Sequence, residues 1–279
     1  MPNNRINFNG NLINPESQIF SSQSRGVAYG DGLFETIRMT DGSIPFLSLH
    51  FNRLVKGMNY LGFLLPENFT LAYIETEIRK IAEGNSRIRI TLTRAFGGKY
   101  TPSNNTFSFL IESESLSHSK FLLNNEGKRL TIYSKERLTC SSLSNLKTCN
   151  ALLYILGSQY AQNNGYDDAL MINEYSNVSE STHSNLFLVK NGTVTTPPLT
   201  EGCIEGVTRK VLLEVLLEKG LPVLETPIKS DELVDVDEIW LTNSIQGLQW
   251  VAAVQDSKQY SNALARHAIK WLNQRFTIK

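Results

Sequence analysis

The chain has 279 residues, 41% of them hydrophobic, which is enough to bury one large core or two modest ones. Because 27 basic and 27 acidic side chains cancel, no basic stripe is available for a phosphate backbone, and nucleic acid is excluded as an expected partner. The N-terminal residues lack an apolar signal core, and no later run approaches the roughly 20 apolar residues of a membrane span. These features predict a cytoplasmic protein of two domains that has no membrane partner.

The three cysteines are Cys140, Cys149 and Cys203, and no two of them form a CxxC pair. An odd number of cysteines outside a secreted chain indicates free thiols that are mostly buried. We therefore expect neither disulfides nor a metal site.

In the first part of the chain, apolar residues recur at helical spacing over 44–63, which predicts an amphipathic helix. A second helix is expected over 71–83. The segments 87–96 and 106–113 are rich in β-branched and aromatic residues with partial alternation, as strands are. A polar stretch around 114–121 marks the expected boundary between domains.

The second part begins with a strand over 129–134 and a helix whose residues Leu152, Ile155, Leu156 and Tyr160 mark one face. The dipeptide Asn191-Gly192 joins two apolar runs and predicts a tight hairpin. Further elements are expected as follows: a strand over 168–173, a helix over 206–220 with Gly220 as its left-handed cap, a strand over 237–244 and a last helix over 261–275.

The alternation of helices and strands predicts an α+β fold made of two mixed α/β domains. A smaller N-terminal domain is expected over 1–117. A larger C-terminal domain over 118–279 is expected to carry Lys147, at the start of the helix that contains Leu152.

A lysine at such a position is usually a surface residue whose stem packs and whose charge reaches water. Lys147 is more informative together with Glu180, which precedes an apolar strand and needs a cationic or hydrogen-bonding partner. Residues 201–209 end at a helix N-terminus, a ready anion site to which Thr208 adds a hydroxyl. An amine, an acid and an anion cup are the parts that hold pyridoxal phosphate.

The chain resembles the fold-type IV, or class IV aminotransferase, group of pyridoxal-phosphate enzymes. This group includes branched-chain aminotransferases, D-amino-acid aminotransferases and 4-amino-4-deoxychorismate lyases. The resemblance runs through seven segments in the same order: SRGVAYGDGLFETIR, LHFNRL, RIRITLTRAFGG, LKTCNALL, VSESTHSNLFLV, TPPLTEGCIEGVTR and LTNS. It implies a site at the domain interface with pyridoxal 5'-phosphate as the cofactor.

Residue by residue, the resemblance implies two catalytic groups. Lys147 forms the Schiff base with the cofactor and then moves the α-proton, and Glu180 faces the pyridine nitrogen. Arg53 would grip the phosphate, a task that suits a forked guanidinium. The further phosphate contacts implied are Val207, Thr208, Thr242 and Ser244.

For the substrate, the candidates are Tyr29, Thr36, Arg89 and Arg94. The two arginines are five residues apart on one strand and therefore lie on opposite faces, so at most one should point at the substrate carboxylate. Arg89 corresponds better to the site arginine of branched-chain enzymes.

The first hypothesis is a class IV aminotransferase acting on an amino acid, with a branched-chain type of substrate. The alternatives are 4-amino-4-deoxychorismate lyase, which the form of Phe34-Glu35-Thr36 and the loop after Arg94 resemble, and a relative that binds the cofactor without turnover. A D-amino-acid aminotransferase is disfavoured because that loop has no histidine. The resemblance also implies a homodimer, in which the smaller domain of one subunit closes over the site of the other.

Overall fold

The computed structural model describes residues 5–19, 21, 23–255 and 259–277. The chain forms two compact units. Unit 1 comprises Met1–Ser119 and Leu146–Asn150, and unit 2 comprises Lys120–Asn145 and Ala151–Lys279. In the described part of the chain, no helix is both long and apolar enough to cross a membrane.

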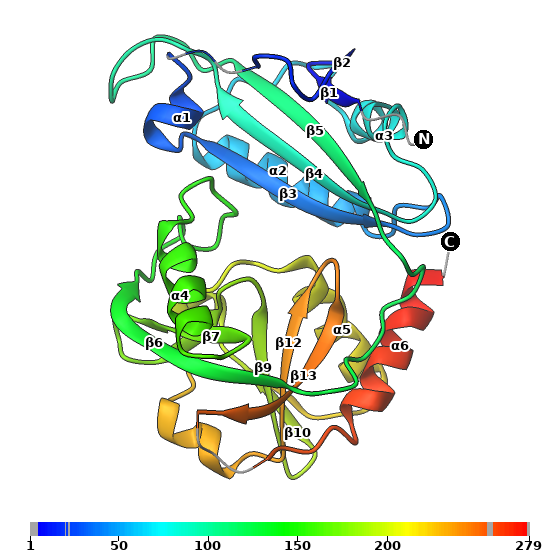
Figure 1. Ribbon diagram of the computed structural model, residues 1–279, viewed down its shortest axis with the longest axis vertical. Helices are drawn as coiled ribbons and strands as arrows, with labels where there is room; N and C mark the ends of the chain where they lie inside the picture. Colours follow the sequence, from blue (N-terminus) through cyan, green and yellow to red (C-terminus); the bar gives the residue numbers. More distant parts are fainter. Residues whose placement is uncertain (1–4, 20, 22, 256–258, 278–279) are drawn as a thin grey trace. The chain divides into compact units, whose positions relative to one another are not determined.

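Unit 1 is built on a five-stranded sheet in the order β2-β1-β5-β4-β3, with antiparallel neighbours (Figure 1). Helices α2 and α3 pack on one face of this sheet. The bounds are β1 Ile6–Phe8, β2 Asn11–Ile13, α1 Arg25–Tyr29, β3 Gly32–Met39, α2 Leu47–Tyr60, α3 Leu71–Arg79, β4 Ser86–Arg94 and β5 Phe107–Ser115. The two helices and the strands β4 and β5 confirm the elements expected from the sequence.

Strand β3 alternates between the two faces of this sheet. Leu33 and Ile37 are buried in the core under the helices, whereas Phe34 and Thr36 lie on the other face. Thr36 is directly opposite Arg89 of β4, so these two side chains share that face. The second face is therefore where a reactive surface can be built without disturbing the core.

The segment 146–150 adds a short antiparallel stretch to the outer edge of β3. The N–H of Phe34 donates to the carbonyl of Lys147 at 2.9 Å, and the N–H of Cys149 donates to the carbonyl of Gly32 at 2.9 Å. The side chain of Leu146 is buried in the unit 1 core. Lys147 is thus held against β3 by backbone bonds, whereas the sequence indicated a helix start in the C-terminal domain; helix α4 begins later, at Leu152.

Unit 2 contains an eight-stranded sheet in the order β11-β10-β9-β12-β13-β6-β7-β8, in which β8 also pairs with β9. The pairing of β8 with β9 closes a ring of six strands, in the order β9-β12-β13-β6-β7-β8, so this part of the sheet is a closed barrel. The bounds are β6 Lys128–Leu138, β7 Asp168–Asn173, β8 Val178–Ser181, β9 Asn185–Lys190, β10 Thr193–Thr196, β11 Val223–Glu225, β12 Glu238–Asn243 and β13 Gly247–Val254. The predicted hairpin at Asn191-Gly192 is confirmed, with φ of 51° and 77° at its two centres.

Helices α4 (Leu152–Asn163), α5 (Val207–Glu218) and α6 (Ala265–Thr277) accompany this sheet (Figure 1). Short 3₁₀ helices cover Leu199–Glu201 and Ser230–Asp235. Leu212 and Leu216 of α5 share a core cluster with Phe187 and Trp240 of the sheet. Helix α5 therefore begins and runs where its apolar pattern predicts.

Helix α4 differs from the expectation in the face that it buries. Its small residues Gly157 and Ala161 are buried, whereas Leu152, Ile155 and Leu156 are 73%, 49% and 43% exposed. Small side chains let the helix approach Met171 of β7 closely, and this turns the large apolar side chains outward. The result is a stripe of exposed aliphatic side chains, here called the α4 stripe (Leu152, Ile155 and Leu156).

Candidate functional site

A buried ionic cluster lies between β3 and α2 in unit 1. Arg53 donates from Nε to Oε1 of Glu35 at 2.7 Å and from Nη2 to Oε2 at 2.6 Å. Nδ1 of His50 lies 2.8 Å from the same Oε2. His50 and Arg53 are three residues apart on α2 and therefore share one helix face, which is turned toward Glu35.

The protonation of this cluster is set by competing effects. Burial raises the pKa of Glu35, but the charge of Arg53 and the bonds from His50 and Arg53 outweigh it and bring the pKa down to about 2. Burial lowers the pKa of His50, opposed by Glu35 and assisted by the charges of Arg53 and Lys147. Glu35 is therefore ionised at neutral pH.

On the other face of β3, two predicted site residues meet at one aromatic ring. The Nζ of Lys147 lies 4.3 Å from the ring centroid of Phe34, and the guanidinium carbon of Arg89 lies 4.1 Å from the same centroid. Burial lowers the pKa of Arg89 from its ordinary value. The structure thus brings Lys147, Arg89 and Thr36 to one place on unit 1.

Arg94 has a different environment from Arg89, although both lie on β4. Its Nε donates to Asp31 at 2.9 Å, Nη1 to the side chain of Asn105 at 2.8 Å and Nη2 to the carbonyl of Leu61 at 2.8 Å. The residue is buried. Its guanidinium is used to hold unit 1 together, as expected for the arginine on the opposite strand face.

Tyr29 lies at the end of α1 and is 40% exposed. The guanidinium of Arg25 lies 5.0 Å from its ring centroid, and the ring of Tyr100 lies 5.7 Å away. Arg25 is itself buried and donates to the carbonyls of Gly97 and Lys99, so it holds the loop after β4 against α1. Tyr29 is therefore placed beside a braced loop and outside the Phe34 group.

In unit 2, Glu180 lies within β8 and is only 2% exposed. The hydroxyl of Tyr154 donates to its Oε1 at 2.7 Å, and the N–H of Ile204 donates to the same oxygen at 3.1 Å. The side chain of Asn185 donates to Oε2 at 3.1 Å. Burial and the charge of Glu180 raise the pKa of Tyr154 well above its ordinary value, so the phenol keeps the proton that it donates.

The residues predicted to form an anion cup lie at the start of α5. Its N-cap Gly206 makes no side-chain hydrogen bond to the helix, and the first N–H groups of a helix, here those of Val207 and Thr208, have no partner within the helix itself. Thr242 of β12 is 1% exposed, and its hydroxyl has no hydrogen-bond partner among the described residues. Ser244 follows β12 in the turn toward β13.

The residues present suit pyridoxal phosphate. An uncapped helix N-terminus and a buried hydroxyl without a partner match the needs of a phosphate, and Glu180 offers a buried carboxylate for a ring nitrogen. Lys147 supplies an amine on unit 1. The predicted residues therefore divide into a unit 1 set (Lys147, Arg53, Tyr29, Thr36, Arg89 and Arg94) and a unit 2 set (Glu180, Val207, Thr208, Thr242 and Ser244).

Three residues that the sequence reasoning did not assign are central to these sets: Phe34, Tyr154 and Asn185. Asn185 carries the clearest signal, because it is an amide at the start of an apolar strand five residues after Glu180. Tyr154 lies on α4 among apolar residues, where its hydroxyl gives no hint of a partner 26 residues away.

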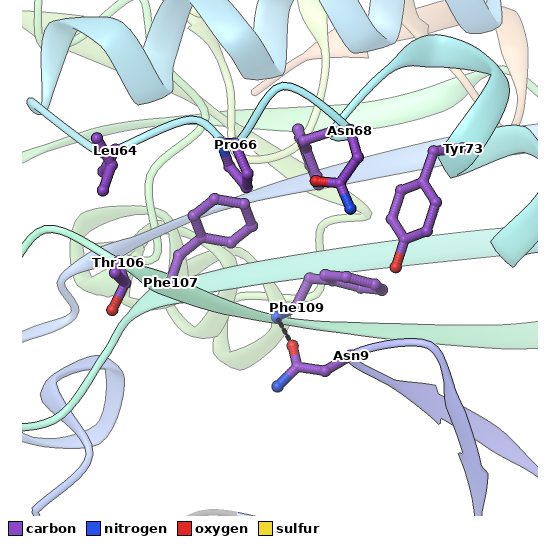
Figure 2. A pocket seen from close by; sticks show the side chains of 9 residues that line it. Asn9, Leu64, Pro66, Asn68, Tyr73, Thr106, Phe107 and Phe109 are labelled. Carbon is purple, nitrogen blue, oxygen red and sulfur yellow. Dashed lines mark hydrogen bonds between the residues drawn. The ribbon is translucent and has the colours of Figure 1, made fainter.

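A separate pocket of about 320 Å³ lies on unit 1, between the segment after α2 and the beginning of β5 (Figure 2). The rings of Phe69, Tyr73, Phe107 and Phe109 line it, and Asn9 accepts the N–H of Phe109 at 2.8 Å. None of the predicted site residues contributes to its lining. The pocket is therefore distinct from both sets.

The model of the family described as amino-transferase class IV matches residues 32–254. A putative branched-chain-amino-acid aminotransferase of Methanocaldococcus jannaschii is 29% identical over 98% of this chain and 95% of that protein. A D-alanine aminotransferase of Bacillus licheniformis is 26% identical over 86% of this chain and 84% of its own length. An aminodeoxychorismate lyase of Bacillus subtilis is also 26% identical, over 86% of this chain and 83% of that protein.

Among solved structures, the branched-chain aminotransferase of Thermoproteus uzoniensis, determined with norvaline, superposes with a TM-score of 0.87. It is 24% identical and covers 97% of this chain and 93% of that one, so it shares the fold. The family match spans most of the chain and contains Lys147, Glu180 and the start of α5. The chain belongs to the class IV amino-transferase family.

Proposed function

We propose that this protein is a pyridoxal-phosphate enzyme that transfers the amino group of an amino acid with a branched apolar side chain to a 2-oxo acid. One observation carries the proposal: Lys147 and Arg89 contact the ring of the same residue, Phe34. Both distances are measured to the centroid of the Phe34 ring. The Nζ of Lys147 and the guanidinium carbon of Arg89 are therefore separated by no more than the sum of the two distances. An amino acid bonded to the guanidinium through its carboxylate therefore keeps its amino group near Lys147.

In this proposal, the cofactor contacts are the residues that the sequence predicted. When bound, pyridoxal phosphate supplies an aldehyde that receives the amino group and a ring that withdraws electrons from the α-carbon. Lys147 holds it covalently, and Glu180 keeps a proton on the ring nitrogen. The phosphate contacts are Arg53, Val207, Thr208, Thr242 and Ser244, of which Thr242 is supported by its buried unpartnered hydroxyl.

Lys147 has a second task, which is to move the proton of the α-carbon once the substrate amine has displaced it. A lysine can act as a base only when its amine is neutral. The carbonyl of Lys147 accepts the N–H of Phe34, so the residue is held against β3 and its amine would stay beside the substrate for this transfer.

Arg89 is proposed to bind the substrate carboxylate, because Arg94 already uses three of its nitrogens within unit 1. Phe34 would contact the apolar side chain of the substrate, with Thr36 beside it and Tyr29 at the edge. Arg94 would act on the substrate only through the loop that follows it.

The second candidate is aminodeoxychorismate lyase, which releases pyruvate and 4-aminobenzoate. The observation that favours it is Thr36, whose position opposite Arg89 puts a hydroxyl on the face that carries Lys147. A hydroxyl there suits a polar ring substrate better than an aliphatic one. The same residues would bind the cofactor in either case.

We also propose that the enzyme works as a homodimer in the cytoplasm. The α4 stripe exposes three aliphatic side chains in a row, an arrangement that a second copy of the chain would cover. The three cysteines are free thiols, as in proteins of a reducing compartment. Sedimentation of the wild type and of Leu152→Ser/Leu156→Ser tests the dimer, which the double change should weaken.

The decisive test of the cofactor role compares Lys147→Ala with Lys135→Ala. Lys135 is a matched control, because its ammonium also lies over an aromatic ring, 5.1 Å from that of Tyr160. Lys147→Ala should lose the visible absorbance of the lysine-bound cofactor and nearly all turnover. Lys135→Ala should keep both. Absorbance and turnover that survive in Lys147→Ala would contradict the proposal and favour a relative that binds without reacting.

A substrate panel then separates the two reactions. Leucine, isoleucine and valine should convert the absorbance of the wild type to that of the aminated cofactor, and 2-oxoglutarate should restore it. D-Alanine should react weakly, since the loop after Arg94 carries no histidine. Release of pyruvate from aminodeoxychorismate without reaction of the branched-chain amino acids would assign the lyase instead.

A further inference from the structure

Asn185 occupies the point at which the two cofactor-binding parts of unit 2 meet. It is the antiparallel partner of Glu180 in β8 and of Thr242 in β12. Residues directly opposite each other in a ladder point to the same face of the sheet. Glu180, Asn185 and Thr242 therefore form one row of side chains across three strands.

The side chain of Asn185 binds two groups at once. Its Nδ2 donates to Oε2 of Glu180 at 3.1 Å and to the carbonyl of Ile204 at 2.9 Å. The N–H of Ile204 in turn donates to Oε1 of Glu180 at 3.1 Å. Both backbone groups of Ile204 are thus fastened to the Glu180–Asn185 pair.

This attachment lies two residues before Gly206, the residue at which the predicted anion cup begins. Gly206, the N-cap of α5, packs directly on Asn185, because a Cβ built there would lie 1.9 Å from Oδ1. Only a residue without a side chain fits this approach. A displacement of the Asn185 side chain toward Gly206 would therefore press on the start of α5.

We propose that Asn185 is a positioning residue that fixes the distance between the carboxylate of Glu180 and the N-terminus of α5. The inference rests on the proposed function and assigns this residue the task of holding the ring-nitrogen site and the phosphate site in register. Asn185 touches neither reacting atom. It acts through Glu180 on one side and through Ile204 and Gly206 on the other.

The first test measures two affinities on the full chain after removal of its cofactor, one for pyridoxal and one for inorganic phosphate. Asn185→Ala should weaken both by roughly tenfold, because it frees Glu180 and the start of α5 together. Asn173→Ala is the matched control, since Asn173 is also buried in unit 2 and donates to a buried glutamate, Glu201, at 2.6 Å. The control should lower stability and leave both affinities unchanged.

The second test changes Gly206, the residue that packs against Asn185. Its first variant therefore does not depend on whether Asn185→Ala folds. Gly206→Ala places a methyl group against Oδ1 of Asn185 and should weaken the binding of pyridoxal, because it displaces the amide that bonds to Glu180. In Asn185→Ala/Gly206→Ala the collision is absent, so the double variant should bind no worse than Asn185→Ala. Losses that multiply in the double variant would overturn the proposal.

Steady-state kinetics provide a third readout. Asn185→Ala should lower kcat at saturating cofactor and leave the KM for the amino acid within about twofold, because the substrate contacts lie on unit 1. An unchanged phosphate affinity in Asn185→Ala, with a wild type that binds pyridoxal phosphate through Lys147, would refute the positioning role alone. Failure of the wild type to bind the cofactor would refute the proposed function itself.

Discussion

Glu35 of unit 1 and Glu180 of unit 2 are both buried carboxylates, with 1% and 2% of their surfaces exposed, yet they are held in different ways. Glu35 is bonded by the guanidinium of Arg53 and the imidazole of His50. The bonds described to Glu180 come from a phenol, an amide and a peptide N–H, all of them neutral donors.

The difference shows how the type of donor determines what a buried carboxylate can do. A cation partner stabilises the charge strongly, and its removal leaves an uncompensated charge in the interior. Neutral donors stabilise less but fix the direction of each oxygen. The Glu35 cluster is accordingly suited to holding unit 1 together, and the donors around Glu180 are suited to aiming a carboxylate at a ligand.

The largest expected effect comes from Arg53→Leu, which leaves Glu35 buried without its main cation. We expect the free energy of unfolding to fall by about 3 kcal/mol, measured by urea denaturation. Arg79→Leu is the control, because Arg79 pairs with Glu75 at 2.7 Å on the surface and its loss should change stability by less than about 1 kcal/mol. Equal losses in the two variants would show that the Glu35 cluster is no stronger than a surface pair.

A second experiment measures how the contribution of the Glu35 cluster to the free energy of unfolding changes as the pH falls. The pKa of Glu35 is about 2 in the folded chain and is ordinarily 4.5, so the unfolded chain binds its proton first as the pH falls. The stabilisation is therefore complete above pH 4.5 and is lost toward pH 2, with about 2 kcal/mol of it disappearing between pH 5 and pH 3. Glu35→Gln should remove this part of the pH dependence, and an unchanged slope in that variant would contradict the low pKa.

The smallest effect is expected from Tyr154→Phe, which removes one of the neutral donors from Glu180. Loss of a hydrogen bond to a charged acceptor should lower the free energy of unfolding by about 1–2 kcal/mol and weaken cofactor binding. Tyr260→Phe provides the comparison, because its buried hydroxyl donates to a neutral carbonyl, that of Leu233, at 2.9 Å. Cofactor binding should be unaffected in the control, and a parallel loss there would mean that Tyr154 acts only through stability.

Much of the fold could be predicted because periodicity reports on burial. The sequence predicts a helix over 206–220, and the apolar residues Val207, Val211, Val215 and Leu216 of α5 are all buried. The short strands β1, β2 and β11 were not predicted, since three residues carry too little pattern. The side of α4 that packs was also not predictable, because Gly157 and Ala161 bury it without an apolar signal.

In the candidate site, the sequence alone singles out Lys147 and Glu180 because one residue type points to one chemistry, and their roles stay predictions. The residues that hydrogen-bond to Glu180 were harder to predict. A bond between residues 26 positions apart, such as that between Tyr154 and Glu180, depends on the tertiary structure alone. The placement of Arg89 and Arg94 on opposite faces of β4 followed from strand alternation. The partners of the two arginines could not be predicted in this way, since Phe34, beside Arg89, and Asp31, beside Arg94, come from a different segment of the chain.

The short stretch 146–150 has a consequence for how the protein can be divided. The polypeptide leaves unit 1 after Ser119, returns to it for these five residues and leaves again, so no single cut releases a complete unit 1. A fragment that stops at residue 119 would present the bare rim of β3, with the N–H of Phe34 open to any passing strand. A hybrid that joins units of different origin must therefore take residues 146–150 from the donor of its unit 1.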